Sequence, residues 1–142
     1  MIHLFLDTNI VIDFLTDRKP FSVGAAKLFD YSVKGQVKLY LSAVSYNNIY
    51  YIIRKLSSHK AALKTLKAVE EITVTIDTTA TSIKSALYSD FKDFEDGIQY
   101  YSAKENRELN GIVTRNPTDF KFSKLPIWTP EQAVKFVGSA NR

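Results

Sequence analysis

The chain has 142 residues, of which 45% are hydrophobic and 13% aromatic, and its formal net charge is +4. The length is typical of one domain, and the apolar content excludes a disordered chain. The absence of cysteine excludes disulfides, thiolate metal sites and cysteine nucleophiles, and it fits a reducing compartment such as the cytoplasm. The modest positive charge is compatible with a polyanionic partner.

The start of the chain is too short and too acidic for a signal peptide, because Asp7 interrupts its apolar run. No stretch approaches the length needed to span a bilayer, so we expect no membrane segment. We expect one domain over residues 1–138, followed by a short tail at residues 139–142 that frays.

Strands and helices are predicted to alternate along the chain. Apolar and β-branched runs predict strands at residues 2–6, 37–41, 73–76, 111–114 and 127–128. Helical spacing predicts helices near residues 10–15, 22–34, 43–57, 59–70, 80–89 and 94–108, and a last one from Thr129. This alternation predicts an α/β fold: a single three-layer domain with a mostly parallel central sheet flanked by helices.

The most informative segment runs from Leu4 to Asp13, where an apolar strand ends on the carboxylate of Asp7. In open α/β sheets the ligand crevice lies at the carboxyl ends of the strands. Asp7 is therefore a candidate site residue. The alternative is that Asp7 or Thr8 caps the helix that follows.

Polar residues also follow the second and fourth predicted strands. They are Ser42, Ser45, Thr114, Asn116 and Asp119. Because the carboxyl ends of parallel strands lie at one edge of the sheet, we expect these residues to gather near Asp7.

A further pair of carboxylates, Asp93 and Asp96, opens a predicted helix. Their spacing places both on one side of its first turn. The alternative is that Asp93 caps the helix and Asp96 stabilises its dipole. Gly97 favours a site slightly, since glycine within a helix is costly and often permits a close approach.

Several carboxylates at one edge, without histidine or cysteine nearby, form a hard oxygen site that suits Mg²⁺ or Mn²⁺. Such an ion, held by a few carboxylates, is the usual device for hydrolysing phosphodiesters. The sequence therefore predicts a metal site with this chemistry.

Four segments, in this order and spacing, resemble the PIN domain family, in particular the VapC-like toxins of bacterial toxin–antitoxin pairs. They are Leu6-Asp7-Thr8-Asn9, Ser42-Ala43-Val44-Ser45, Asp93 to Gln99, and Val113-Thr114-Arg115-Asn116 through Asp119-Phe120. The resemblance implies a small α/β fold and a Mg²⁺- or Mn²⁺-dependent ribonuclease. It also implies RNA as substrate, a homodimer and inhibition by a cognate antitoxin.

The resemblance assigns roles to individual residues. Asp7 and Asp96 match metal ligands of the family. Asp93 is a neighbouring acid, and Asp119 is the candidate substitute for a fourth acid at Asn116. The residues with supporting roles are Asn9, Asn48, Thr114 and Asn116.

Asn48 departs from the family, because an acid usually occupies this position. Helix geometry favours Asn48 over Asn47, since Asn48 lies about 40° around the helix from inward-facing Ile52 and Asn47 about 140°. An amide binds a cation without charge and is a poor general base, so we expect one loosely held ion rather than two. The alternative is that Asn48 is a polar residue on a helix flank.

Basic residues are candidates for RNA contacts. Lys60, Lys64 and Lys67 share one helix face, which is either a phosphate-contacting surface or an ordinary solvated face. Arg115, beside the proposed site, is the best candidate for binding the scissile phosphate, since its planar fork matches phosphate oxygens.

Two other functions remain open. One is a PIN-like module that binds RNA or protein without cutting, which Asn48 supports. The other is a phosphoryl-transfer or receiver-type α/β domain, which an aspartate after a strand and Thr114 favour. This second alternative lacks paired acids after the first strand and a lysine after the last.

Overall fold

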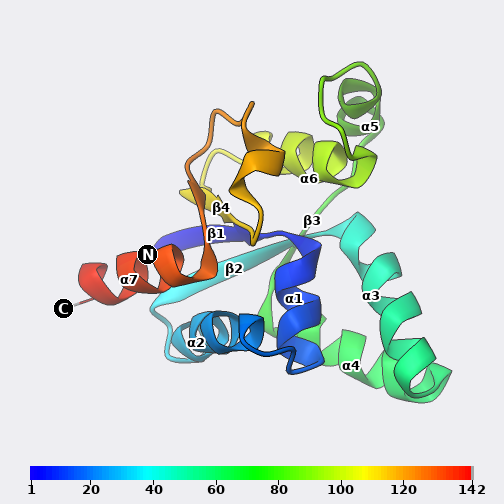
Figure 1. The fold of residues 1–142 in the computed structure, drawn as a ribbon, viewed down its shortest axis with the longest axis vertical. Coiled ribbons are helices and arrows are strands. Elements are labelled where there is room, and N and C mark those ends of the chain that lie inside the picture. Colours follow the sequence, from blue (N-terminus) through cyan, green and yellow to red (C-terminus); the bar gives the residue numbers. More distant parts are fainter. Residues whose placement is uncertain (142) are drawn as a thin grey trace.

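The computed structural model describes residues 1–141 and contains a five-stranded sheet in the order β3-β2-β1-β4-β5 (Figure 1). All neighbouring strands are parallel. The strands are β1 (Ile2–Leu6), β2 (Val37–Ser42), β3 (Val74–Ile76), β4 (Gly111–Val113) and β5 (Ile127–Trp128). The predicted α/β class is confirmed, and the sheet is entirely parallel.

Within residues 1–141, six α-helices and one 3₁₀ turn connect the strands, and a seventh α-helix follows the last strand. They are α1 (Thr8–Leu15), α2 (Phe21–Val33), α3 (Ala43–Leu56), α4 (His59–Ile72), α5 (Ala80–Leu87), α6 (Phe94–Lys104), η1 (Pro117–Phe120) and α7 (Pro130–Ala140). Each is too short or too polar to cross a membrane.

Several helix boundaries differ from the sequence prediction by one to four residues, including those of α1 and α6. Helix α1 begins directly after Asp7, so the turn between strand and helix is tighter than predicted. Helix α6 ends at Lys104 rather than near residue 108. The Asn106 side chain accepts a hydrogen bond from the Glu108 backbone amide at 2.9 Å, which favours a turn over helix there.

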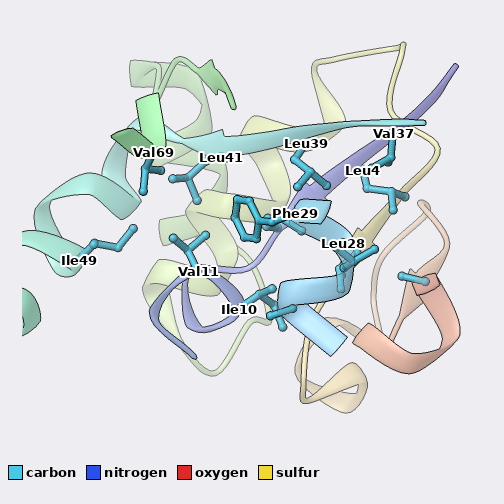
Figure 2. Packing of buried hydrophobic residues seen from close by; sticks show 14 of the residues in the cluster. Leu4, Ile10, Val11, Leu28, Phe29, Val37, Leu39, Leu41, Ile49 and Val69 are labelled. Carbon is cyan, nitrogen blue, oxygen red and sulfur yellow. The ribbon is translucent and has the colours of Figure 1, made fainter. Parts of the chain in front are cut away.

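The alternation of side chains along β1 separates two apolar clusters. Leu4 and Leu6 face the larger cluster, which α1, α2, α3, α4 and α7 cover. Figure 2 shows part of it, with Leu39 and Leu41 of β2 near Val11 and Phe29. Phe5 faces the other side, where α6 and η1 cover the sheet. The three-layer arrangement follows from this alternation.

Helix α5 packs against the first turns of α6, and Gly97 makes the approach possible. A Cβ atom at this position would lie 3.1 Å from the Ala86 Cβ atom and 3.4 Å from that of Phe91. The close approach anticipated for Gly97 is therefore a contact between helices. It also brings Phe91 over the start of α6, beside the carboxylates considered below.

The predicted frayed tail at residues 139–142 is partly helical. Helix α7 continues to Ala140, and the Asn141 side chain donates a hydrogen bond to the Val137 carbonyl at 2.8 Å. This bond satisfies a carbonyl at the helix end, which favours order up to Asn141. The last residue of the proposed tail, Arg142, lies outside the described residues.

Candidate active site

Asp7 lies at the carboxyl edge of the sheet and is 4% exposed. Its backbone amide donates to the Val113 carbonyl at 2.9 Å, which joins the end of β1 to β4. Asp7 occupies the N-cap position of α1, but its side chain makes no capping hydrogen bond. The absence of this bond favours a site over the capping role.

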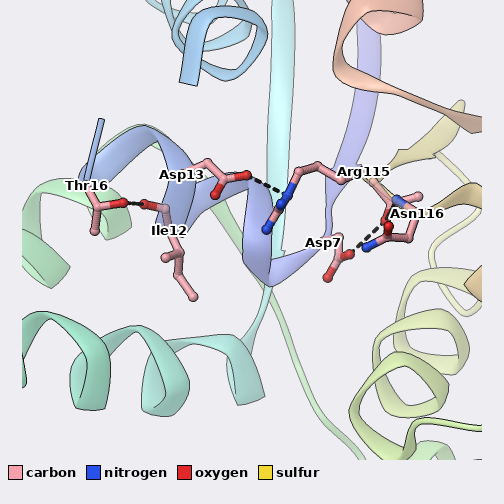
Figure 3. A network of polar contacts seen from close by, with 7 residues as sticks. Asp7, Ile12, Asp13, Thr16, Arg115 and Asn116 are labelled. Atoms are coloured by element: carbon pink, nitrogen blue, oxygen red, sulfur yellow. Dashed lines mark hydrogen bonds and ion pairs between the residues drawn. The ribbon is translucent and has the colours of Figure 1, made fainter. Parts of the chain in front are cut away.

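Two side chains hold the Asp7 carboxylate. The Thr114 hydroxyl donates to Oδ2 at 2.8 Å, and Gln99 Nε2 donates to Oδ1 at 3.2 Å. The Asn116 backbone amide donates to the same hydroxyl at 3.2 Å, and Figure 3 shows Asn116 close to Asp7. Burial raises the pKa of Asp7, and the hydrogen bonds from Thr114 and Gln99 oppose this shift.

Sequence reasoning missed Gln99 as a functional residue. It is fully buried, and its Oε1 accepts from the Thr8 backbone amide at 3.1 Å while Nε2 reaches Asp7. A signal for it existed, because Gln99 follows Asp96 by three residues and therefore shares its helix face. Gln99 connects α6 to the start of α1.

A cavity of about 520 Å³ opens beside Asp7. Its lining includes five residues that the sequence predicted for the site: Asp7, Asn9, Asp93, Asp96 and Asp119. These come from the end of β1, the first turn of α1, the start of α6 and η1. The parallel sheet and the turn at α6 thus bring acidic groups together from distant parts of the sequence.

Asp93 and Asp96 open α6, as predicted. Asp93 Oδ1 accepts the Asp96 backbone amide at 3.0 Å, so Asp93 caps the helix while also lining the cavity. Burial raises the pKa of Asp96 to about 7, and the nearby charges of Asp7, Asp93, Asp119 and Glu95 add to the shift. Such a shift, from burial and like charges in a cavity, is typical of functional sites.

Glu95 also lines the cavity and was missed as a site residue. It is partly buried, and its Oε1 atom is shielded from solvent without a hydrogen-bond partner. Burial raises the pKa of Glu95, and the charges of Asp7 and Asp93 raise it further. The sequence contained no signal that separated Glu95 from an ordinary acid in the first turn of a helix.

Helix α3 brings only one of its two expected residues, Ser45, close to the segment around Asp7. Asn48 is partly buried and is absent from the cavity lining. Ser45, one turn earlier, is buried, and its hydroxyl lies 2.5 Å from that of Thr8. The angle between Asn48 and Ile52 identifies the inward side of α3, but Ser45 is closer to the carboxyl edge of the sheet.

Arg115 points away from the carboxylates that line the cavity. Its Nε atom lies 2.8 Å from Asp13 Oδ2, as Figure 3 shows, and its guanidinium lies 4.2 Å from the Phe21 ring centroid. Arg115 does not line the acidic cavity, and Asn116 is likewise absent from the lining. The lysines that do line it are Lys92 and Lys121.

The predicted basic stripe is located elsewhere. Lys60, Lys64 and Lys67 are exposed on α4 and do not line the cavity. Helix α4 covers the face of the sheet opposite α6, as Figure 1 shows. The stripe is therefore remote from the α6 carboxylates.

The residues of the cavity fit a divalent cation by their chemistry. Their donors are carboxylate oxygens, the ligands that Mg²⁺ and Mn²⁺ prefer. The buried Oε1 of Glu95 lacks a partner, and a cation would offset both the burial and the like charges that raise the pKa of Asp96. Within residues 1–141, however, no three acidic, histidine or cysteine side chains are already gathered closely enough to hold one ion.

The fold and the site together define a class: a small all-parallel α/β domain with carboxylates converging at the carboxyl edge of its sheet. The PIN domain family model matches residues 3–118, which is most of the chain. The chain therefore belongs to the PIN domain family, and the resemblance seen in its motifs is confirmed.

Individual relatives agree with this assignment. Ribonuclease VapC1 of Aquifex aeolicus (strain VF5) is 26% identical over 137 residues, which cover 91% of each chain. The structure of VapBC2 from Rickettsia felis, bound to a promoter DNA fragment, is similar with a TM-score of 0.63 at 14% identity, covering 89% of this chain and 97% of that one. A toxin–antitoxin complex from Klebsiella pneumoniae has a TM-score of 0.61 at 21% identity, with the same coverage. At these identities the structural likeness concerns the fold.

Proposed function

We propose that the protein is a Mg²⁺- or Mn²⁺-dependent endoribonuclease. The observation that carries this proposal is the meeting of Asp7 and Asp96 in one cavity, with Thr114 and Gln99 holding the Asp7 carboxylate. The name of the Aquifex relative, a ribonuclease, supports the choice of RNA as substrate.

Asp7 and Asp96 would hold the metal ion, and Glu95 or Asp119 would complete its ligands. Asp93 would add negative charge while capping α6. When bound, such an ion stabilises charge on a phosphate and activates an attacking water. Thr114 and Gln99 orient Asp7, because each donates a hydrogen bond to a different carboxylate oxygen. Lys92 and Lys121, which line the same cavity, would attract RNA phosphates.

The proposed biological role is that of a toxin in a type II toxin–antitoxin pair, acting in the cytoplasm. The structural relatives include toxin–antitoxin complexes, which supports a cognate antitoxin as partner. We also propose that the protein forms a homodimer, as the family resemblance implies. Co-expression with the protein encoded by the adjacent gene, followed by co-purification, tests the antitoxin.

The activity is tested by incubating structured RNAs with wild type and Asp7→Asn, in Mg²⁺, in Mn²⁺ and in EDTA. We expect cleavage by wild type in either metal and none in EDTA or with Asp7→Asn. Equal cleavage by both proteins would contradict the assignment of Asp7.

A second candidate function is a PIN module that binds RNA without cutting it. Two observations favour it: α3 supplies no acid at Asn48, and no three ligands are already gathered in residues 1–141. Binding of RNA by wild type, without cleavage in either metal, would establish this alternative.

A further inference from the structure

The lining of the acidic cavity also includes side chains of different chemistry. Phe91 and Phe122 line it together with Lys92 and Lys121. Phe122 is 50% exposed, and the Lys121 ammonium lies 5.2 Å from its ring centroid. Aromatic rings flanked by cations, in the same cavity as the carboxylates, have no part in holding a metal ion.

Other aromatic rings support Phe122 from the protein side. Its ring meets Phe91 edge-on, with centroids 6.3 Å apart and an angle of 67°. Phe91 in turn lies 5.3 Å from Tyr100 and 6.0 Å from Phe120, both of which are buried. The exposed ring is therefore the outermost member of an aromatic cluster that continues into the core.

We propose that Phe122 is a stacking platform for an unpaired RNA base next to the phosphate held at the carboxylates. This inference rests on the proposed function. A large exposed aromatic side chain lowers solubility and contributes little to the core. Stacking on a base would cover the exposed face of the Phe122 ring, while Phe91 holds the ring from the protein side. Lys92 and Lys121 beside it would neutralise neighbouring phosphates.

The charge distribution favours a nucleic acid over an apolar ligand. The lining combines six carboxylates with two lysines and two phenylalanines, and the lysines and phenylalanines come from the segments Phe91–Lys92 and Lys121–Phe122. A single-stranded RNA offers a phosphate for a metal ion held by the carboxylates, a base for the aromatic rings and further phosphates for the lysines. A duplex covers both faces of its bases, so the platform requires an unpaired nucleotide. Stacking is tolerant of sequence, so little selectivity for the base is expected here.

The test measures RNA binding in the Asp7→Asn background, where cleavage is removed. The probe is a short single-stranded RNA that carries a fluorescent adenine analogue, whose emission is quenched when the base stacks. Phe122→Ala should weaken binding by about 5- to 100-fold and abolish the quenching, as expected for loss of one stacked base. Phe122→Trp should retain both. The loss should persist at high salt, where the contribution of Lys121 declines.

Phe94→Ala is the matched control, because Phe94 is 49% exposed but does not line the cavity. It should bind the probe as the Asp7→Asn parent does. Melting curves of each variant confirm that it is folded. The same RNA annealed to its complement should bind equally to proteins with and without Phe122.

Three outcomes would overturn the platform. If wild type cuts RNA but Phe122→Ala binds as tightly as its parent, the stacking proposal is wrong while the proposed function stands. A contact with a protein partner would then be the alternative role of Phe122. If Phe94→Ala weakens binding as much as Phe122→Ala, the effect is not specific to the cavity. If wild type neither cuts nor binds RNA, the proposed function fails and the platform with it.

Discussion

The Nε atom of Arg115 lies 2.8 Å from Oδ2 of Asp13, and this ion pair joins the segment after β4 to α1. The Asp13 side chain is 1% exposed, so the pair is largely removed from solvent. Burial raises the pKa of Asp13, and the charges of Arg115 and Arg18 oppose the shift. The neighbour of Arg115, Thr114, donates to Asp7, so the pair anchors the segment that orients the proposed catalytic carboxylate.

Arg115→Met should therefore reduce stability rather than RNA affinity. Removing the cation leaves a buried carboxylate without its partner, which costs about 3 kcal/mol or more. Urea denaturation measures this cost. Adding Asp13→Asn should recover part of it, because the unpaired charge is then gone. A stable Arg115→Met variant with weakened RNA binding would instead favour the phosphate contact that the sequence predicted.

Asp7→Asn should fold normally yet lose cleavage by a factor of about 100 or more, which equals roughly 3 kcal/mol of transition-state stabilisation. The variant keeps the shape of the side chain but removes its charge. Because Asp7 makes no capping bond, the helix should not weaken. Single-turnover rates on one RNA, with melting curves as the folding check, test this. Full cleavage by a nuclease-free preparation of the variant would exclude Asp7 from catalysis.

Mn²⁺ should raise the melting temperature of wild type, because a ligand that binds only the folded state stabilises it. Asp96→Asn and Glu95→Gln should each reduce this rise, since both side chains line the cavity. Asn48→Asp, which lies outside the lining, should change it less. The quantity to compare is the shift on adding metal, because removing one of several repelling carboxylates can itself stabilise the metal-free protein. An undiminished shift in Asp96→Asn would locate the ion elsewhere.

The metal-free protein should lose stability as pH rises from about 4 to 8. The pKa of Asp96 is raised from 3.8 to about 7, so the folded state binds its proton more tightly than the unfolded state does. Its stabilising contribution is therefore complete below the unfolded pKa and is lost as pH rises through the folded one. Because Asp96 is only partly buried, solvent screening limits the effect to about 1–2 kcal/mol.

Urea denaturation in EDTA at several pH values, with Asp96→Asn as the reference, isolates this contribution. The difference between the two proteins should grow with pH in favour of the variant. A constant difference would show that Asp96 titrates alike in the folded and unfolded states.

Local patterns in the sequence were sufficient for the α/β class and for most of the acidic residues. The alternation of side chains in β1 and the helical spacing of apolar residues elsewhere are local patterns, because they involve only residues that are close in the sequence. Asp7 follows an apolar strand, and the first turn of α6 carries Asp93 and Asp96. Parallel strands bring their carboxyl ends to one edge, so these positions could be inferred without coordinates.

Only the tertiary structure decided which other side chains join them. Glu95 and Phe122 line the cavity, and Gln99 reaches Asp7, because α6 and the segment around η1 pack on the same face of the sheet, a contact between separate segments of the chain. Arg115 turns to Asp13 rather than toward the carboxylates, because a buried carboxylate needs a partner and α1 places one within reach. The sequence by itself determined the elements and the edge where the acids meet. The packing of those elements determined which polar groups face the cavity and which pair with each other, because burial and charge compensation depend on contacts that local sequence does not specify.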